Sequence, residues 1–257
     1  MPPRTAFALM LAAISIPAIA AEGDGALLFA DTSVSGLYGG GFEVDPSPQG
    51  TLTLEQSSGW SVGDLYWFVD STHYARADGA GHRSSWYGEF SPRLSLGKLS
   101  GRALTAGPVK DVLIAATYEL GRDSQTTESG LLGLGVDLDL PGFSYFQANV
   151  YARKDLHQGD WDTWQLTLSG ARPFAIGQQR FLIDGFIDYV APGGPHAWNL
   201  HIVPQLKWDL GHALGHADGK LWLGAEIDIW RNKYGIGDSA ALRTDQNAAS
   251  VLLRWHF

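Results

Sequence analysis

The chain has 257 residues, with 27 Asp and Glu against 18 Lys and Arg, and it has no cysteine. The acidic balance argues against a nucleic-acid partner, because phosphate binding needs clustered cations, and the lack of cysteine excludes the small disulfide-stapled extracellular class. Ten Trp, 9 Tyr, 11 Phe and 32 Gly instead suit an antiparallel β-barrel.

The N-terminal residues predict a secretory signal. Arg4 supplies a positive charge, and Ala6–Ile16 forms an apolar stretch that is too short to span a bilayer. Ala18-Ile19-Ala20 fits a cleavage site, so we expect a signal peptide at 1–20 and one domain at 21–257. The alternative is a short N-terminal anchor, which the length of the apolar stretch disfavours.

Clusters of Gly, Pro, Asn and Asp divide the rest of the chain into about 12 candidate strands, an even number as bacterial barrels require. No linker or low-complexity tract separates them, which indicates a single domain. The expected spans are 32–43, 50–57, 62–72, 84–96, 109–120, 127–140, 143–154, 160–173, 179–190, 196–209, 219–231 and 247–257.

The clearest alternation is a hairpin that turns at Pro141-Gly142. Its first arm, 129–140, puts leucines on one face and Gly, Ser and Asp on the other, with Leu131 as the exception. Its second arm, 143–153, puts Asn149, Tyr151 and Arg153 on the polar face. Such period-2 patterns over arms of about 11 residues, twice an ordinary strand, predict a membrane barrel, although a periplasmic β-sandwich would also alternate.

The C-terminal strand favours the barrel. Ala249, Val251, Leu253, Trp255 and Phe257 alternate to the last residue, a pattern that resembles the signal read by the barrel-assembly machinery of bacterial outer membranes. We therefore expect an outer-membrane location, with the apolar face against lipid and the polar face inward. Outward tryptophans near strand ends fit interfacial belts, namely Trp86, Trp164, Trp198, Trp208 and Trp255.

The inward faces combine carboxylates with aromatic rings. The segments Asp64–Asp70 and Asp184–Asp188 both place rings between carboxylates on one face. The full predicted lining comprises Asp64, Asp70, Glu89, Asp111, Glu119, Asp137, Asp139, Asp184, Asp188, Glu226 and Asp228, the cations Arg93, Arg153, Arg180, Lys207 and Arg254, and the aromatic residues Tyr66, Phe68, Tyr87, Tyr151, Phe186, Trp222 and Trp230.

Such a lining suits a flat, uncharged solute with polar edges. Rings would stack on the solute, and carboxylates would accept hydrogen bonds from its hydroxyl and amino groups. The competing interpretation is structural, because aromatic side chains can fill a narrow barrel while the acids pair with Arg93, Arg153 and Arg180. An excess of carboxylates disfavours anionic solutes in either case.

Several segments resemble the nucleoside-specific channel-forming family of outer-membrane proteins, called Tsx-type. The resemblance is carried by Glu89–Ser95, Gly107–Asp111, Gly133–Asp137, Asn149–Arg153 and Asp160–Asp162, together with Asp64–Asp70. It is weakest from Ala175 to Gln246 and in the short external loops. The family implies a monomeric 12-stranded barrel with a narrow channel for nucleosides, and it carries over Asp64, Tyr66, Phe68, Asp70, Glu89, Arg93, Asn149, Tyr151 and Arg153 as lumen positions.

The function that we predict is passive diffusion of nucleosides through the outer membrane, with no cofactor and no metal. The residues expected to contact the solute are Asp64, Tyr66, Phe68, Asp70, Tyr87, Glu89, Arg93, Asn149, Tyr151, Arg153, Asp184, Phe186, Asp188 and Trp230. The alternatives are a pore for another small solute and a structural or surface-receptor barrel. An enzyme such as an outer-membrane phospholipase would need a Ser–His pair at the lipid-facing rim, and no local serine accompanies the histidines.

Overall fold

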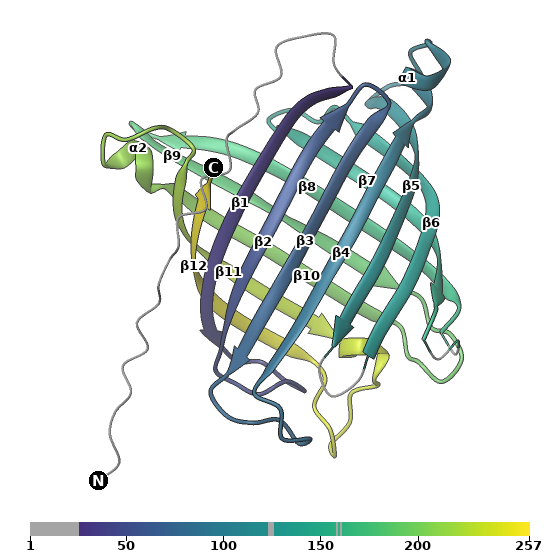
Figure 1. Ribbon diagram of the computed structural model, residues 1–257, viewed down its shortest axis with the longest axis vertical. Helices are drawn as coiled ribbons and strands as arrows, with labels where there is room; N and C mark the ends of the chain where they lie inside the picture. The colour runs from purple at the N-terminus through teal and green to yellow at the C-terminus, as the bar shows by residue number, and fades with distance from the viewer. Residues whose placement is uncertain (1–25, 123–125, 158, 160) are drawn as a thin grey trace.

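The computed structural model describes residues 26–122, 126–157, 159 and 161–257. Twelve antiparallel strands form a closed barrel, in which each strand pairs with its neighbours in the chain and β1 pairs with β12 (Figure 1). This confirms the predicted fold class. The expected signal peptide at 1–20 lies outside the described residues.

The strand bounds lie close to the predicted spans, with differences of a few residues at most ends. The strands are β1 (Leu27–Gly40), β2 (Gln49–Trp60), β3 (Gly63–Tyr74), β4 (Ser84–Ser95), β5 (Val109–Arg122), β6 (Thr126–Leu138), β7 (Tyr145–Asp155), β8 (Thr163–Ile176), β9 (Gln179–Val190), β10 (Asn199–Asp209), β11 (Leu221–Arg231) and β12 (Gln246–His256). The described helical segments are short: α1 (Leu96–Ser100), α2 (Leu210–Ala213) and the 3-10 turn η1 (Lys233–Gly235).

Exposure shows which face of each strand points outward. In β6, the side chain of Leu134 is 59% exposed, although it is among the most apolar of the strand. Its partner across the hairpin, Val150, is also exposed, whereas the polar residue Asn149, next to Val150 on β7, is buried. Leu131, which breaks the alternation, lies on the inward face and packs with Ala115 and Tyr151. The barrel is therefore apolar outside and polar inside, as a lipid environment requires.

The seam between β1 and β12 keeps the same alternation of inward and outward side chains. Val251 on the outer face of β12 is 63% exposed, whereas the adjacent Leu252 is fully buried. Its neighbour Arg254 points inward beside Ser35 of β1. The faces of β1, which the sequence alone does not assign, are thus set by pairing with the last strand.

The two ends of the barrel differ. One end, the terminal end, carries α1, α2 and the C-terminus, and it includes the tight turns at 61–62 and 177–178 (Figure 1). The opposite end, the far end, carries the β1–β2, β3–β4 and β11–β12 loops. Because short turns are typical of the periplasmic side of bacterial barrels, we expect the terminal end to face the periplasm. Among the described residues, no helix has the length and apolarity to cross a membrane.

The outward face predicts a depth-dependent cost of charge. Leu134→Arg, in the middle of β6, should lower the free energy of unfolding by about 2–4 kcal/mol, because the guanidinium would face the apolar centre of the bilayer. The matched variant Leu138→Arg, at the terminal end of the same strand, should cost only about 0–1 kcal/mol. Urea-dependent folding into lipid vesicles measures both values, and equal costs would contradict the proposed depth of the strand.

Candidate functional site

The interior of the barrel is crossed by hydrogen-bonded ion pairs that join distant strands. Arg93 of β4 is only 4% exposed, and its Nε and Nη2 atoms lie 2.8 and 2.7 Å from the carboxylate of Asp64 on β3. Nη2 also lies 2.9 Å from Asp137 on β6, and Nη1 donates to Asn149 on β7 at 3.5 Å. One guanidinium thus connects four strands.

Arg153 of β7 organises a second group. Its two terminal nitrogens each donate to the Glu119 carboxylate at 2.6 Å, and they also donate to Gln165 at 2.8 Å and to Ser129 at 3.0 Å. Because both oxygens of Glu119 are used, the pair has the bidentate geometry that makes Arg–carboxylate contacts strong. This group fixes the inner wall along β5 to β8.

Two further cations complete the paired set on the other side of the barrel. Arg254 lies 2.9 Å from Glu55 and donates to Ser35 at 2.8 Å and to Gln205 at 3.2 Å. Lys207 is paired with Asp184. The structural interpretation of the lining therefore holds for five predicted site residues, namely Asp64, Arg93, Asn149, Arg153 and Asp184.

Four inward carboxylates have no such cation. Their hydrogen bonds come from uncharged groups: Thr53 donates to Asp70 at 2.5 Å, Tyr87 to Glu89 at 2.8 Å, Thr167 to Asp188 at 2.5 Å and Gln205 to Glu226 at 2.7 Å. Within the described part of the chain, none of the four forms an ion pair. They supply the lumen with carboxyl groups that are not committed to a cation.

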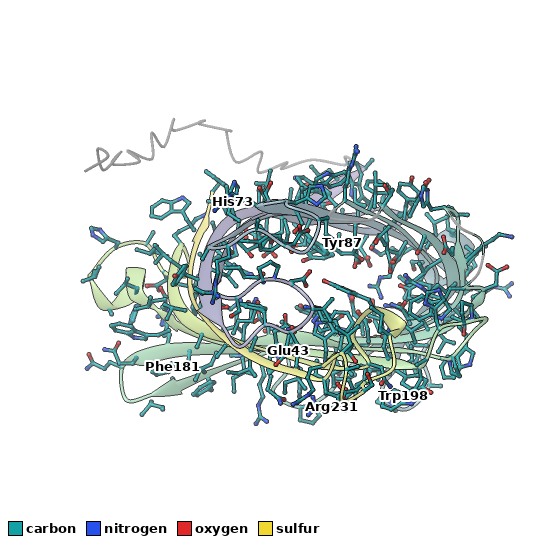
Figure 2. The ribbon with its side chains drawn as sticks, turned by 90° about the horizontal axis from the view of Figure 1, so that it is seen from below. Glu43, His73, Tyr87, Phe181, Trp198 and Arg231 are labelled. Carbon is teal, nitrogen blue, oxygen red and sulfur yellow. The ribbon has the colours of Figure 1, made fainter. Side chains whose placement is uncertain are left out.

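Aromatic rings line two separate parts of the inner wall. On β3 and β4, the ring centroid of Phe68 lies 5.9 Å from that of Tyr66 and 5.9 Å from that of Tyr87. Figure 2 shows Tyr87 inside the oval cross-section of the barrel, whereas Phe181 and Trp198 lie on its outside. Tyr66 keeps 39% of its surface exposed although its strand position faces inward, so the ring is open to the lumen.

The second aromatic group contains a histidine. His201 stacks on Trp230 with ring centroids 3.7 Å apart and planes inclined by 15°. Phe186 meets His201 edge-on at 5.0 Å, and His201 Nε2 lies 3.2 Å from Asp228. These rings come from β9, β10 and β11, so the lumen presents aromatic faces from two walls.

The hairpin residues that the sequence singles out are inward but tightly packed. Tyr151 is 4% exposed and belongs to a buried cluster with Ala115 and Leu131. Asn149 is equally buried and accepts from Arg93. Both residues therefore support the wall, and the open lumen surface lies at other positions.

Three predicted lining residues lie at the terminal rim. Asp139 follows the end of β6 at Leu138 and is exposed. Arg180 is half exposed and donates to Asp218 at 2.5 Å, outside the inner network. Asp111 accepts from the backbone of Gly97 at 3.3 Å, next to α1. The prediction of lumen positions for Asp139 and Arg180 was wrong, because alternation carries no information on facing once a strand has reached the rim.

Other residues that line the lumen were not predicted from the sequence. Tyr145 is inward and well exposed, and its odd number gives it the same parity as Gln147 and Asn149 on β7, so alternation could have identified it. Glu55 lies on β2, whose faces were not assigned. Phe42, in the β1–β2 loop, carries no sequence signal because loops do not alternate.

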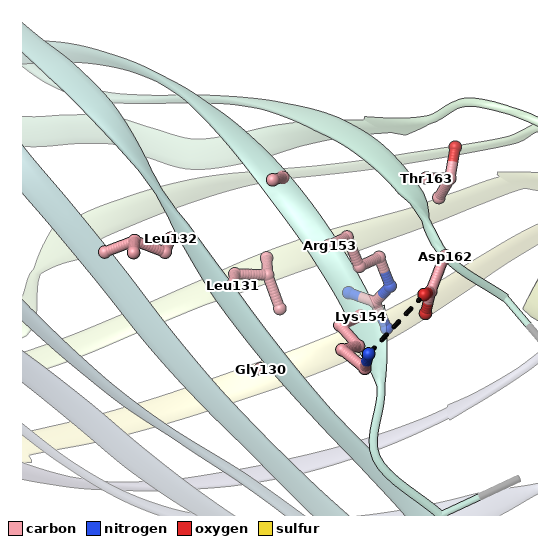
Figure 3. Close-up of a pocket in the computed structure, with 8 residues that line it drawn as sticks. Gly130, Leu131, Leu132, Arg153, Lys154, Asp162 and Thr163 are labelled. Atoms are coloured by element: carbon pink, nitrogen blue, oxygen red, sulfur yellow. Dashed lines mark ion pairs between the residues drawn. The ribbon is translucent and has the colours of Figure 1, made fainter. Parts of the chain in front are cut away.

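A depression on the outer surface is unrelated to this lumen. It lies between β6 and β7, where Gly130 and Ala152 are small and Leu132 faces outward (Figure 3). A Lys154–Asp162 ion pair of 3.7 Å borders it. Among the described residues, no group of His, Cys, Asp and Glu has the arrangement of a metal site.

Comparisons with known proteins agree with this architecture. The profile of the family described as "Nucleoside-specific channel-forming protein, Tsx" matches residues 40–251. An outer membrane protein, OmpK, of Vibrio parahaemolyticus serotype O3:K6 is 28% identical over 96% of this chain and 97% of its own length. The nucleoside-specific channel-forming protein Tsx of Escherichia coli O157:H7 is 26% identical over 75% of this chain and 64% of its own length.

A solved structure also shares the fold. The NanC porin superimposes with a TM-score of 0.50 at 11% identity, over 87% of this chain and 98% of the porin. Together, the barrel and the family match identify the chain as an outer-membrane channel, and they agree with the prediction that it is not an enzyme.

The inner network predicts that breaking a buried ion pair lowers the free energy of unfolding more than breaking an ion pair at the rim. Arg93→Met removes the partner of two carboxylates that lie inside the barrel, so the free energy of unfolding should fall by about 3–5 kcal/mol. The control Arg180→Gln breaks a pair that is half exposed to solvent and should cost about 0–1 kcal/mol. Urea unfolding in vesicles compares the two variants, and a similar cost for both would refute the structural role of Arg93.

Proposed function

Since the chain belongs to the Tsx family of nucleoside-specific channel-forming proteins, we propose that its lumen passes nucleosides by passive, saturable diffusion. In this proposal the protein acts as a monomer in the outer membrane and uses no energy source. The observation that carries the proposal is the combination of open aromatic rings with carboxylates that lack a cation partner. Both features occur on the inner face, where a solute would pass.

The aromatic rings fit the base of a nucleoside. Tyr66, Phe68 and Tyr87 form a continuous series on adjacent strands, with 5.9 Å between successive centroids. Stacking on an aromatic side chain contributes about 1–3 kcal/mol per base and tolerates different bases, because every base has a π-face. A series of such rings supports movement from one weak contact to the next, which conduction requires.

The carboxylates fit the sugar and the amino groups of the base. Asp70, Glu89, Asp188 and Glu226 receive hydrogen bonds only from uncharged groups, so they can accept more from a hydroxyl or amino group. The same charges repel phosphate. We therefore propose that the channel distinguishes nucleosides from nucleotides by charge, and nucleosides from sugars by stacking.

The stacking role predicts weaker binding when the rings are removed. In planar bilayers, adenosine or thymidine should block single-channel current in a saturable manner. The double variant Tyr66→Leu/Phe68→Leu should raise the half-blocking concentration roughly tenfold or more, since each stacking contact contributes about 1–3 kcal/mol. The control Tyr118→Leu changes an outward-facing tyrosine and should leave block unchanged.

Two results would contradict the nucleoside proposal. Normal conductance without block at millimolar nucleoside would leave a pore for another solute. Equal block in the double variant and in the Tyr118→Leu control would show that the Tyr66 and Phe68 rings pack within the barrel and do not contact the nucleoside.

The charge of the lumen predicts cation preference. Replacing Glu89 by Gln and Asp188 by Asn keeps the shape of both side chains and removes two ionisable carboxyl groups. The reversal potential in a KCl gradient should show preference for potassium in the unchanged protein and a smaller preference in the variant, because fixed charges at close range select permeant ions. Block by a nucleoside monophosphate should strengthen in the variant, and an unchanged reversal potential would refute the role of these charges.

A further inference from the structure

The loop between β1 and β2, residues 41–48, folds inward at the far mouth of the barrel. Figure 2 shows Glu43 within the outline of the barrel rather than outside it. The backbone N–H of Glu43 donates to Gln246 Oε1 of β12 at 2.8 Å, and the N–H of Gly41 donates to Ser47 Oγ at 3.1 Å. We call this segment the strap.

Lys233 holds the strap to the neighbouring β11–β12 loop, on the other side of the seam between β1 and β12. Lys233, in the β11–β12 loop, is 3% exposed, and its Nζ lies 2.7 Å from Asp45. The same ammonium donates to the Glu43 carbonyl at 3.1 Å and to Gln246 Oε1 at 2.8 Å. The three donors of the ammonium are therefore matched by three acceptors, two of which belong to the strap.

Tyr234 reinforces this contact. Its hydroxyl donates to the Asp45 carboxylate at 2.8 Å, and its ring lies 5.0 Å from Lys233 Nζ, within the range of a cation–π interaction. Asp45 therefore receives two bonds from the β11–β12 loop. We call the contacts among Asp45, Lys233 and Tyr234 the latch.

The backbone on both sides of the latch is strained. Among the described residues, the non-glycine positions with positive φ are Val44 at 70°, Asn232 at 51° and Tyr234 at 59°. All three lie in the strap or in the facing loop. Such conformations persist only where surrounding contacts impose them, and for a β-branched residue such as Val44 the conformation is a clear outlier. Release of the latch would therefore let both loops relax.

The strap also covers part of the lumen that the proposed function uses. A polar cavity of about 150 Å³ lies at this end of the barrel, and its lining includes Phe42, Gln49, Asp70, Thr72, Glu226 and Asp228. Phe42 comes from the strap, and two of the four carboxylates without a cation face the same space. A solute that enters from the far end reaches these carboxylates past the strap.

We propose that the strap is a gate at the external mouth and that the Asp45–Lys233 pair holds it closed. This inference rests on the proposed channel function, because a gate needs a permeation path. Opening swings residues 42–46 away from the cavity, widens the mouth and exposes Asp70 and Glu226 to the outside. Closure limits the size of the solute that can pass.

The test uses labelling of a cysteine under the strap, which the cysteine-free chain makes unambiguous. Thr72→Cys places a thiol in the covered cavity. In this background, Asp45→Ala and, separately, Lys233→Met remove the latch from either side. A charged water-soluble thiol reagent added from outside should react faster in both, on the order of tenfold to a hundredfold, the range expected for lost charge-assisted hydrogen bonds. Single-channel potassium conductance should also rise.

A matched control lies in the same loop. Arg243→Gln removes an ion pair with Asp238 that is confined to the β11–β12 loop and does not reach the strap. It should leave both the labelling rate and the conductance unchanged. Retained urea stability of each variant shows that its barrel is intact.

A second experiment closes the gate instead. In Asp45→Cys/Tyr234→Cys, a short reagent that joins two thiols through reducible bonds should lower potassium conductance, and a reductant should restore it. The inference is overturned if labelling and conductance in the latch variants match the Arg243→Gln control and the crosslink changes nothing. Nucleoside block alongside that result would preserve the proposed function. Faster labelling and higher conductance in the latch variants, without nucleoside block, would instead support the gate and contradict the proposal that nucleosides are the solute.

Discussion

The pairing of β1 with β12 is the constraint on which the rest of this structure depends. In lipid, an unpaired strand edge would leave backbone N–H and C=O groups without partners, at several kcal/mol each. Here the register runs from Ser33 opposite His256 to Gly40 opposite Ala249, so the ladder closes. Closure also fixes parity, because residues that face each other across the seam must point to the same side.

Closure with twelve strands leaves a lumen narrow enough for side chains from different walls to meet. The ion pairs of Arg93, Arg153 and Arg254 follow from this, because their guanidinium groups can reach carboxylates on neighbouring and more distant strands. Carboxylates outnumber these cations, and those left over are the ones available to a solute. The aromatic rings of the inner face come within 6 Å of each other because Tyr66 and Phe68 are two residues apart on β3 and Tyr87 lies on the adjacent strand β4.

Turn residues and alternation together were sufficient to predict the strands and most of their faces. Asp64, Tyr66 and Phe68 face inward as predicted, because successive side chains of a barrel strand point alternately to the lipid and to the lumen. Alternation could not tell a packed inward residue from an open one. Tyr151 and Tyr66 have the same pattern, but only the first packs against Leu131 from the next strand.

The sequence alone also could not predict which residues form ion pairs or where the loops lie. Whether Asp184 pairs with Lys207 or with another cation depends on register and tilt, neither of which a single strand encodes. The rim is a further limit, because the pattern of β6 continues in sequence to Asp139 although the strand has ended. The inward fold of residues 41–48 depends on Lys233, which binds the Glu43 carbonyl although the two residues are 190 positions apart in the chain.

That last separation has a consequence for assembly. Contacts between segments so distant in sequence form late, since the entropy of closing the intervening chain must be lost first. Asp45 belongs to the first hairpin, β1–β2, and Lys233 belongs to the last, β11–β12. The two hairpins meet only when β1 has paired with β12. The Asp45–Lys233 contact therefore forms only after the barrel has closed. Until then, the interior stays open to water at the far end.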